Sequence, residues 1–197
     1  MNNALKSLKL NLLVVLGLTA CSSAVELTYY QLPVPAAASV PSNNSSVVIV
    51  EPVMVANYLN TNALILQRST VELHRTQQHQ WLEALDQQLN RILVSELQAK
   101  LADRTVTTAE FASKAPSTTS QRLLVQIAEF HGTEQGMVIL SGRYSWLANG
   151  GIELQQFRIE LPQPDAGSPA MVQTMGQAMS TLTTQIAEQL QSQQPKP

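Results

Sequence analysis

The spacing of apolar residues changes along the first half of the chain and separates predicted strands from a predicted helix. Residues 47–50 form a continuous β-branched run, which is typical of a strand buried on both faces. Shorter runs at 64–68 and 70–74 predict two further strands. From 81 to 101 the apolar residues recur every three or four positions, which predicts an amphipathic helix of about five or six turns.

The second half repeats this order of strands and helix. A polar stretch at 105–121 predicts a loop with a brief edge strand, and residues 123–130 predict a long strand. Apolar and more polar residues alternate over 138–146, which predicts a half-buried strand. Asn149-Gly150-Gly151 is a strong hairpin turn before the partner strand at 152–161. One apolar stripe then predicts the last helix, with Met171, Val172, Met175, Met179, Leu182, Ile186 and Leu190 as its members.

The order β-β-β-α-β-β-β-α defines the expected fold class. It predicts an α/β (α+β) domain with a single mixed sheet of about six strands covered by two amphipathic helices. The hairpins make part of the sheet antiparallel, and a helical crossover allows a parallel pair. A stripe of three methionines on the last helix can form an adaptable binding surface, but its helical spacing favours the core.

The N-terminus has the plan of an export signal. Lys6 and Lys9 precede the apolar run 10–18, and the small residues Thr19 and Ala20 follow it. The apolar run is about half of the ~20 residues that a helix needs to cross a bilayer, so a permanent membrane span is not expected.

The residues at the end of this signal, Leu18-Thr19-Ala20-Cys21, resemble the lipobox of bacterial lipoprotein precursors. The resemblance implies that the Cys21 thiol is acylated, with palmitate among the expected chains, and that the mature protein begins there. The alternative is an ordinary signal that ends in an incidental cysteine. Ser22 and Ser23 follow where an Asp commonly marks inner-membrane retention, which favours a lipid anchor in the outer membrane, on its periplasmic face.

Proline and a Ser/Asn run before residue 47 favour an extended linker, although 27–32 could form a short strand. The predicted organisation is therefore a signal peptide over 1–20, a lipidated tether over 21–46, a single domain over 47–192 and a disordered tail over 193–197.

Composition narrows the possible partners. Only 13% of the residues are charged, the formal net charge is -2, and no basic block stands out, so nucleic acid is not an expected partner. Cys21 is the only cysteine, so an intramolecular disulfide is excluded and the fold must rest on its packed core. Composition leaves the oligomeric state open, including a homo-oligomer.

Motifs for catalysis, cofactors or metals are not found. The chain has no phosphate-binding glycine loop and no nucleophile elbow, and its one cysteine is assigned to lipid. His74 and His79 are expected to lie on either side of a strand–helix junction, without the spacing of a metal site. Glu83 and Asp86 fit a solvated helix face better than an acid/base pair. We therefore predict no enzyme activity, no cofactor and no metal site.

Three motifs in a fixed order are similar to the PqiC-like family of ABC-type transport auxiliary lipoproteins, from the paraquat-inducible system. They are 29–32 behind the lipobox, 48–59 with its Val-x-Val-x-Pro-Val pattern, and 79–83 opening the long helix. The resemblance implies a fold like the N-terminal domain of TolB. It also implies a partnership with an MCE-domain protein of the PqiB type and its inner-membrane partner.

The implied role is a docking subunit of an envelope-spanning lipid transport system that maintains membrane integrity. Tyr29, Tyr30, Tyr58 and Leu59 match family positions and are tentative partner-binding residues; Tyr58 and Leu59 could instead tuck under the sheet. One alternative is a lipoprotein that binds lipid or lipopolysaccharide and assists outer-membrane assembly, which a closed apolar cavity would favour. A cell-wall enzyme is the least favoured alternative.

Overall fold

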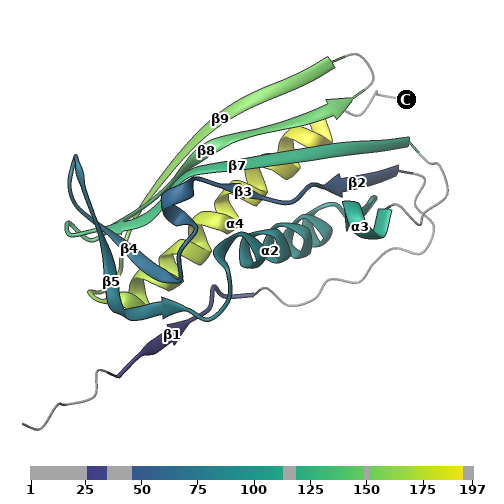
Figure 1. The fold of residues 1–197 in the computed structure, drawn as a ribbon. Coiled ribbons are helices and arrows are strands. Elements are labelled where there is room, and N and C mark those ends of the chain that lie inside the picture. Colours follow the sequence, from purple (N-terminus) through teal and green to yellow (C-terminus); the bar gives the residue numbers. More distant parts are fainter. Residues whose placement is uncertain (1–25, 35–45, 113–118, 149–150, 193–197) are drawn as a thin grey trace, which may run out of the picture.

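Nine strands form one mixed sheet in the part of the chain that this computed structural model describes, residues 26–34, 46–112, 119–148 and 151–192 (Figure 1). The strands are β1 (Thr28–Tyr30), β2 (Ser46–Val50), β3 (Met54–Val55), β4 (Ala63–Ser69), β5 (Glu72–Trp81), β6 (Thr105–Thr108), β7 (Thr119–Thr133), β8 (Met137–Ala148) and β9 (Gly151–Pro162). The long helices are α2 (Leu85–Lys100) and α4 (Ser168–Ser192), and the short ones are η2 (Asn57–Leu59) and α3 (Ala109–Ala112).

Strand β7 is the centre of the sheet. The order β1-β5-β4-β7-β2-β6 runs through it. Strands β3 and β8 also pair with β7, and β9 pairs with β8. The β7–β8–β9 meander is antiparallel, whereas β2 and β4 run parallel to β7. The predicted mixed α/β class is confirmed. The predicted count of about six strands was too low. It left out β1 and β6, which were expected only as a possible short strand within 27–32 and a brief edge strand within 105–121, and β3, which has only two residues.

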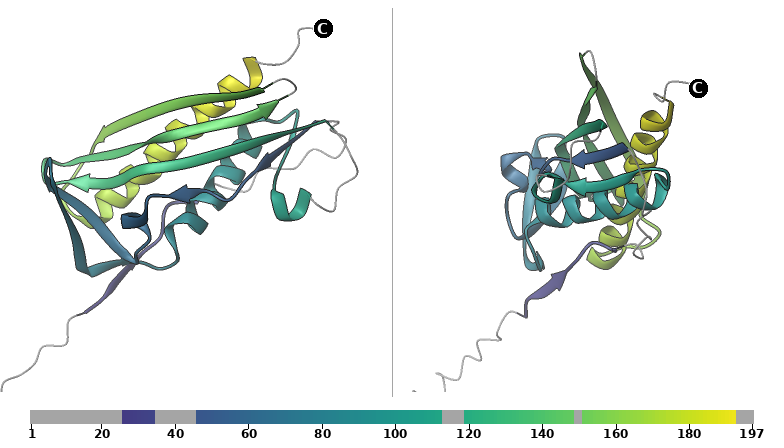
Figure 2. Two further views of the ribbon diagram at one scale, coloured as in Figure 1. Left: turned by 45° about the horizontal axis from the view of Figure 1, so that its top comes forward. Right: turned by 90° about the vertical axis from the view of Figure 1, so that its right-hand side faces the viewer.

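Both long helices lie on the same face of the sheet (Figures 1 and 2). The apolar stripe of α4 is buried, including Met171, Met175 and Met179, so the interpretation of the methionines as core is confirmed. Core side chains from β7, β8, α2 and α4 fill the space between the sheet and the helices, with Trp146 and Phe130 among the largest. Neither these helices nor the shorter ones, within the residues described, have the length and apolar character to span a bilayer.

Helix α2 begins at Leu85, so the prediction of a helix from Trp81 was wrong at its start. Trp81 is the last residue of β5, where its N–H donates to the carbonyl oxygen of Asn62. The predicted strand–helix junction between His74 and His79 was also wrong, since both residues belong to β5.

Residues 28–33 of the segment that was predicted to be a tether pack on the domain. Strand β1 runs parallel to β5, with Tyr30 opposite Trp81. Leu32 is only 1% exposed and joins the core, and its N–H donates to Oε1 of the buried Gln88 on α2 at 2.9 Å. Pro33 then lies against Gly176 of α4, where a Cβ would approach the proline ring to 2.8 Å. The sheet therefore takes in part of the N-terminal segment.

Candidate functional site

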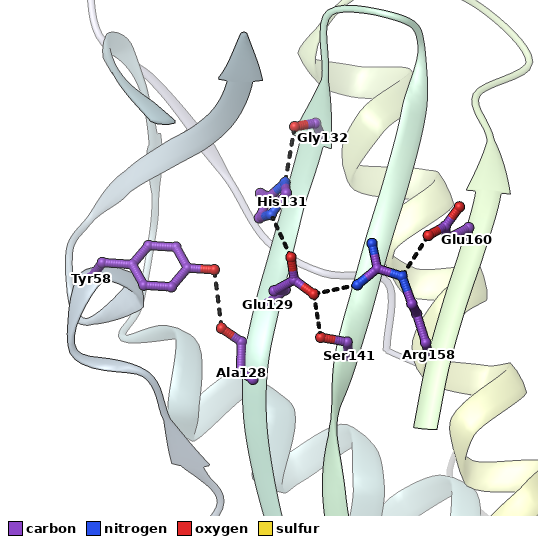
Figure 3. Close-up of polar contacts among 8 residues, drawn as sticks. All are labelled: Tyr58, Ala128, Glu129, His131, Gly132, Ser141, Arg158 and Glu160. Carbon is purple, nitrogen blue, oxygen red and sulfur yellow. Dashed lines mark hydrogen bonds and ion pairs between the residues drawn. The ribbon is translucent and has the colours of Figure 1, made fainter. Parts of the chain in front are cut away.

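The face of the sheet that the helices leave uncovered carries a row of polar side chains (Figure 3). Glu129 on β7 is opposite Ser141 on β8, and Ser141 is opposite Arg158 on β9. Since residues that are directly opposite on neighbouring strands share a face, the three side chains lie side by side. We call this face the open face. The sequence predictions did not identify this cluster.

Glu129 is the acceptor at the centre of the cluster. Its Oε2 atom accepts hydrogen bonds from Ser141 Oγ, at 2.5 Å, and from Nη1 of Arg158. Arg158 also donates from Nε to Oε1 of Glu160 at 2.6 Å. Nε2 of His131 lies 3.9 Å from Oε1 of Glu129, and Nδ1 of the same ring lies 3.2 Å from the carbonyl oxygen of Gly132.

The cluster shifts the pKa values of its members. Burial alone would raise the pKa of Glu129, but hydrogen bonds from Ser141 and Arg158 outweigh it and hold the pKa below its ordinary value. Burial lowers the pKa of His131, which favours the neutral ring. The Ser141 hydroxyl is bonded to a carboxylate and not to this histidine, so it is not arranged as a nucleophile beside a base. The hydrogen bonds of Ser141 and Arg158 to Glu129 instead join β7, β8 and β9 on the open face.

Tyr58 joins the cluster from η2. Its hydroxyl donates to the carbonyl oxygen of Ala128 at 3.1 Å, where the register of β7 shifts between Ile127 and Glu129 (Figure 3). Burial raises the pKa of Tyr58 to about 12, and the charge of Glu129 acts in the same direction. The tyrosine therefore remains protonated and holds η2 against the bulge in β7.

The structure separates the four residues that were predicted to bind a partner. Leu59 is 1% exposed and lies in the core, and Tyr58 is half-buried, which favours the alternative that this pair tucks under the sheet. Tyr30 is half-buried and its hydroxyl contacts Nδ1 of His79 at 3.1 Å. Tyr29, 54% exposed, is the one member of the set with a largely free side chain. Cys21 lies outside the described residues.

Apolar side chains gather on the open face toward the end where β9 begins. Leu124 of β7 and Leu154 of β9 both lie opposite Ser145, and Met54 lies opposite Gln126 on the same face. An open hollow of about 450 Å³ includes Met54 and Leu124, and a second of about 470 Å³ lies beside Arg143 and Arg158. We name this set of apolar residues the open-face patch. Its members are the exposed Met54, Ile152 and Leu154 and the half-buried Leu124.

Metal-binding residues do not gather anywhere in the described ranges, where no group of three or more His, Cys, Asp or Glu side chains could hold an ion. Glu83 lies two residues before α2 and not on its face as expected; it forms an ion pair with Arg91 of α2 at 2.7 Å.

Comparison with known proteins identifies the family of this chain. Residues 30–187 match the family of ABC-type transport auxiliary lipoprotein components. The chain is 33% identical to the intermembrane transport lipoprotein PqiC of Escherichia coli, over 90% of this chain and 94% of that protein. The crystal structure of an uncharacterized protein, 29% identical, superposes with a TM-score of 0.72 over 84% of this chain and 99% of the other. Protein XCC0632 from Xanthomonas campestris shares the fold, with a TM-score of 0.65 at 14% identity, over 84% of this chain and 99% of that protein.

Proposed function

The chain belongs to the family of ABC-type transport auxiliary lipoprotein components, and from this premise we propose that it is the outer-membrane-anchored docking subunit of an MCE-type lipid transport system. The observation that carries the proposal is its similarity, along nearly its whole length, to an intermembrane transport lipoprotein. In this role the protein acts by binding an MCE-domain partner, and not by catalysis.

Acylated Cys21 is the proposed membrane anchor. Two or more acyl chains give stable attachment to a bilayer, whereas one chain gives only marginal binding. Mass spectrometry of the membrane-extracted protein should find an N-terminal cysteine with acyl chains including palmitate. Separation of the inner and outer membranes should place the protein in the outer-membrane fraction. Protein with an unmodified thiol, or in the inner membrane, would contradict the anchor.

The open-face patch is the proposed docking surface for the MCE-domain partner. It lies on the face that α2 and α4 leave uncovered, and Leu154 within it is 54% exposed. Arg122 stands beside it in an ion pair with Glu51 at 3.1 Å, so an apolar centre has a charged rim. An apolar centre within a polar rim is the usual anatomy of a protein interface.

Crosslinking in intact cells tests this surface. Leu154→Asp should reduce the crosslinked product with the MCE-domain partner by about tenfold or more, since loss of a central interface contact costs about 2 kcal/mol. Val71→Asp is the matched control, because Val71 is exposed but lies in the β4–β5 turn, away from the patch. Both variants should unfold like the parent in urea. Equal crosslinking by the two variants would refute the open-face patch as the docking surface. Absence of a crosslink from the parent protein would refute the partnership with an MCE-domain protein.

A further inference from the structure

The short strand β1 limits how far the folded domain can stand from Cys21. Five residues separate Cys21 from Leu27, the residue before β1. An extended chain covers at most about 3.6 Å per residue, so this connection reaches about 20 Å. A tether that ran free to Ser46, where β2 begins, would reach about 90 Å. The pairing of β1 with β5 therefore decides whether the domain sits at the bilayer or stands well away from it.

The attachment of β1 to the domain is held by several contacts. Thr28, Tyr29 and Tyr30 pair with His79, Gln80 and Trp81 of β5. The carbonyl oxygen of Tyr30 accepts from the N–H of Leu82 at 2.8 Å, and the Tyr30 ring lies 5.6 Å from the His79 ring. Two residues later Leu32 is buried in the core, so pulling β1 away would also expose a leucine.

The outer side of β1 is apolar. Leu27 is 44% exposed and Tyr29 is 54% exposed, and they alternate with Tyr30, which packs on the core. Successive side chains of a strand point to opposite faces, so Leu27 and Tyr29 face outward together. Tyrosine is enriched at membrane–water interfaces, because its ring is apolar and its hydroxyl is polar.

The two ends of the domain are far apart. Strand β1 lies at one end in the views of Figure 1 and Figure 2 (left), and α4 finishes at the opposite end, beside the start of β9. One open hollow is lined by both Gln155 of β9 and Gln189 of α4, which confirms that these elements adjoin. The 25 residues of α4 span about 37 Å, which exceeds the reach of the connection from Cys21.

We propose that the domain stands end-on at the membrane, with the start of β1 against the bilayer and Leu27 and Tyr29 in the layer of lipid headgroups. The opposite end, which carries Ile152 and Leu154, then points into the periplasm. The bilayer is the partner that this edge fits, because a connection of about 20 Å ties it directly to the acyl chains. This inference rests on the proposed acylation of Cys21.

The test uses the acylated full-length mature protein with one fluorescent label. Cys21 is the only cysteine and its thiol carries lipid in this protein, so Tyr29→Cys or Ile152→Cys provides a single labelling site. Each labelled protein is inserted into vesicles of phosphatidylethanolamine and phosphatidylglycerol, with and without a lipid that carries a quencher in its headgroup. Ile152 is the matched control, since it is also an exposed apolar residue next to the start of a strand.

The label at position 29 should lose fluorescence when the quencher lipid is present, and the label at position 152 should not. Flotation of the protein with the vesicles and its acylated mass are measured on the same samples. Acylated, floating protein whose two labels are quenched equally, or not at all, would overturn the end-on arrangement and leave the anchor intact. Protein without acyl chains would instead refute the proposed anchor.

Discussion

Replacing Gln88 by alanine tests whether its amide joins the N-terminal segment to the domain. The side chain is fully buried, Oε1 accepts from the N–H of Leu32 at 2.9 Å, and Nε2 donates to the carbonyl oxygen of Glu83 at 2.9 Å. Gln88→Ala leaves one donor and one acceptor without partners. Each unsatisfied buried group costs about 1–3 kcal/mol, so the free energy of unfolding should fall by about 2–6 kcal/mol.

Urea unfolding of residues 22–197 measures this loss, with Gln87→Ala as the matched control. Gln87 is the neighbouring glutamine on α2 and is exposed, so its replacement should change stability by no more than about 0.5 kcal/mol. The two substitutions have the same effect on helix propensity, and their difference therefore isolates the buried hydrogen bonds. Amide exchange should also become faster at Leu32 in Gln88→Ala alone. Equal loss of stability in the two variants would refute the reasoning.

Three further changes test the open face and the C-terminal helix. Burial lowers the pKa of His131 below its ordinary value of 6.5, so the unfolded chain binds more protons at this residue and stability falls as the pH drops below about 6.5. His131→Gln should remove this contribution to the pH dependence of the free energy of unfolding, measured in urea between about pH 7.5 and pH 5.5. Gly142→Ala would place a Cβ 2.1 Å from the carbonyl oxygen of Gln126, and thermal unfolding should show a loss of about 1–3 kcal/mol or more. Arg104→Lys keeps the charge but loses the fork that donates to the carbonyl oxygen of Leu190 at 2.9 Å, so about 1–3 kcal/mol of stability should be lost in urea.

The start of α2 shows why some boundaries could not be predicted. Trp81 and Leu85 are four residues apart, which is the spacing of neighbours on one face of a helix. The residue before the helix, Ala84, makes no side-chain capping bond, so the Ser, Thr, Asp or Asn that usually marks a helix start is missing. Trp81 is held in an extended strand by the long-range pairing of β5 with β1 and by its hydrogen bond to Asn62, and no local pattern encodes these contacts.

The polar cluster could have been predicted in part. The hairpin turn was recognised at 149–151, with the partner strand from 152; the structure pairs Ala148 with Gly151, and this register places Ser141 opposite Arg158. Glu129 could not be added in the same way, because its partner depends on an irregularity in β7. The sequence pattern therefore contained the pair Ser141 and Arg158 but did not show Glu129, the residue that connects them.

That irregularity also decides which residues of β7 are buried. Ile127 lies opposite Gly142, so regular pairing would place Glu129 opposite Leu140 and on the same side as Ile127, in the core. The shift places Glu129 opposite Ser141 on the open face and turns Phe130, 1% exposed, into the core. The hydrogen bond from Tyr58 to Ala128 and the space left by Gly142 both lie at this shift. One extra residue in β7 thus keeps the carboxylate of Glu129 out of the core and makes the whole polar cluster possible.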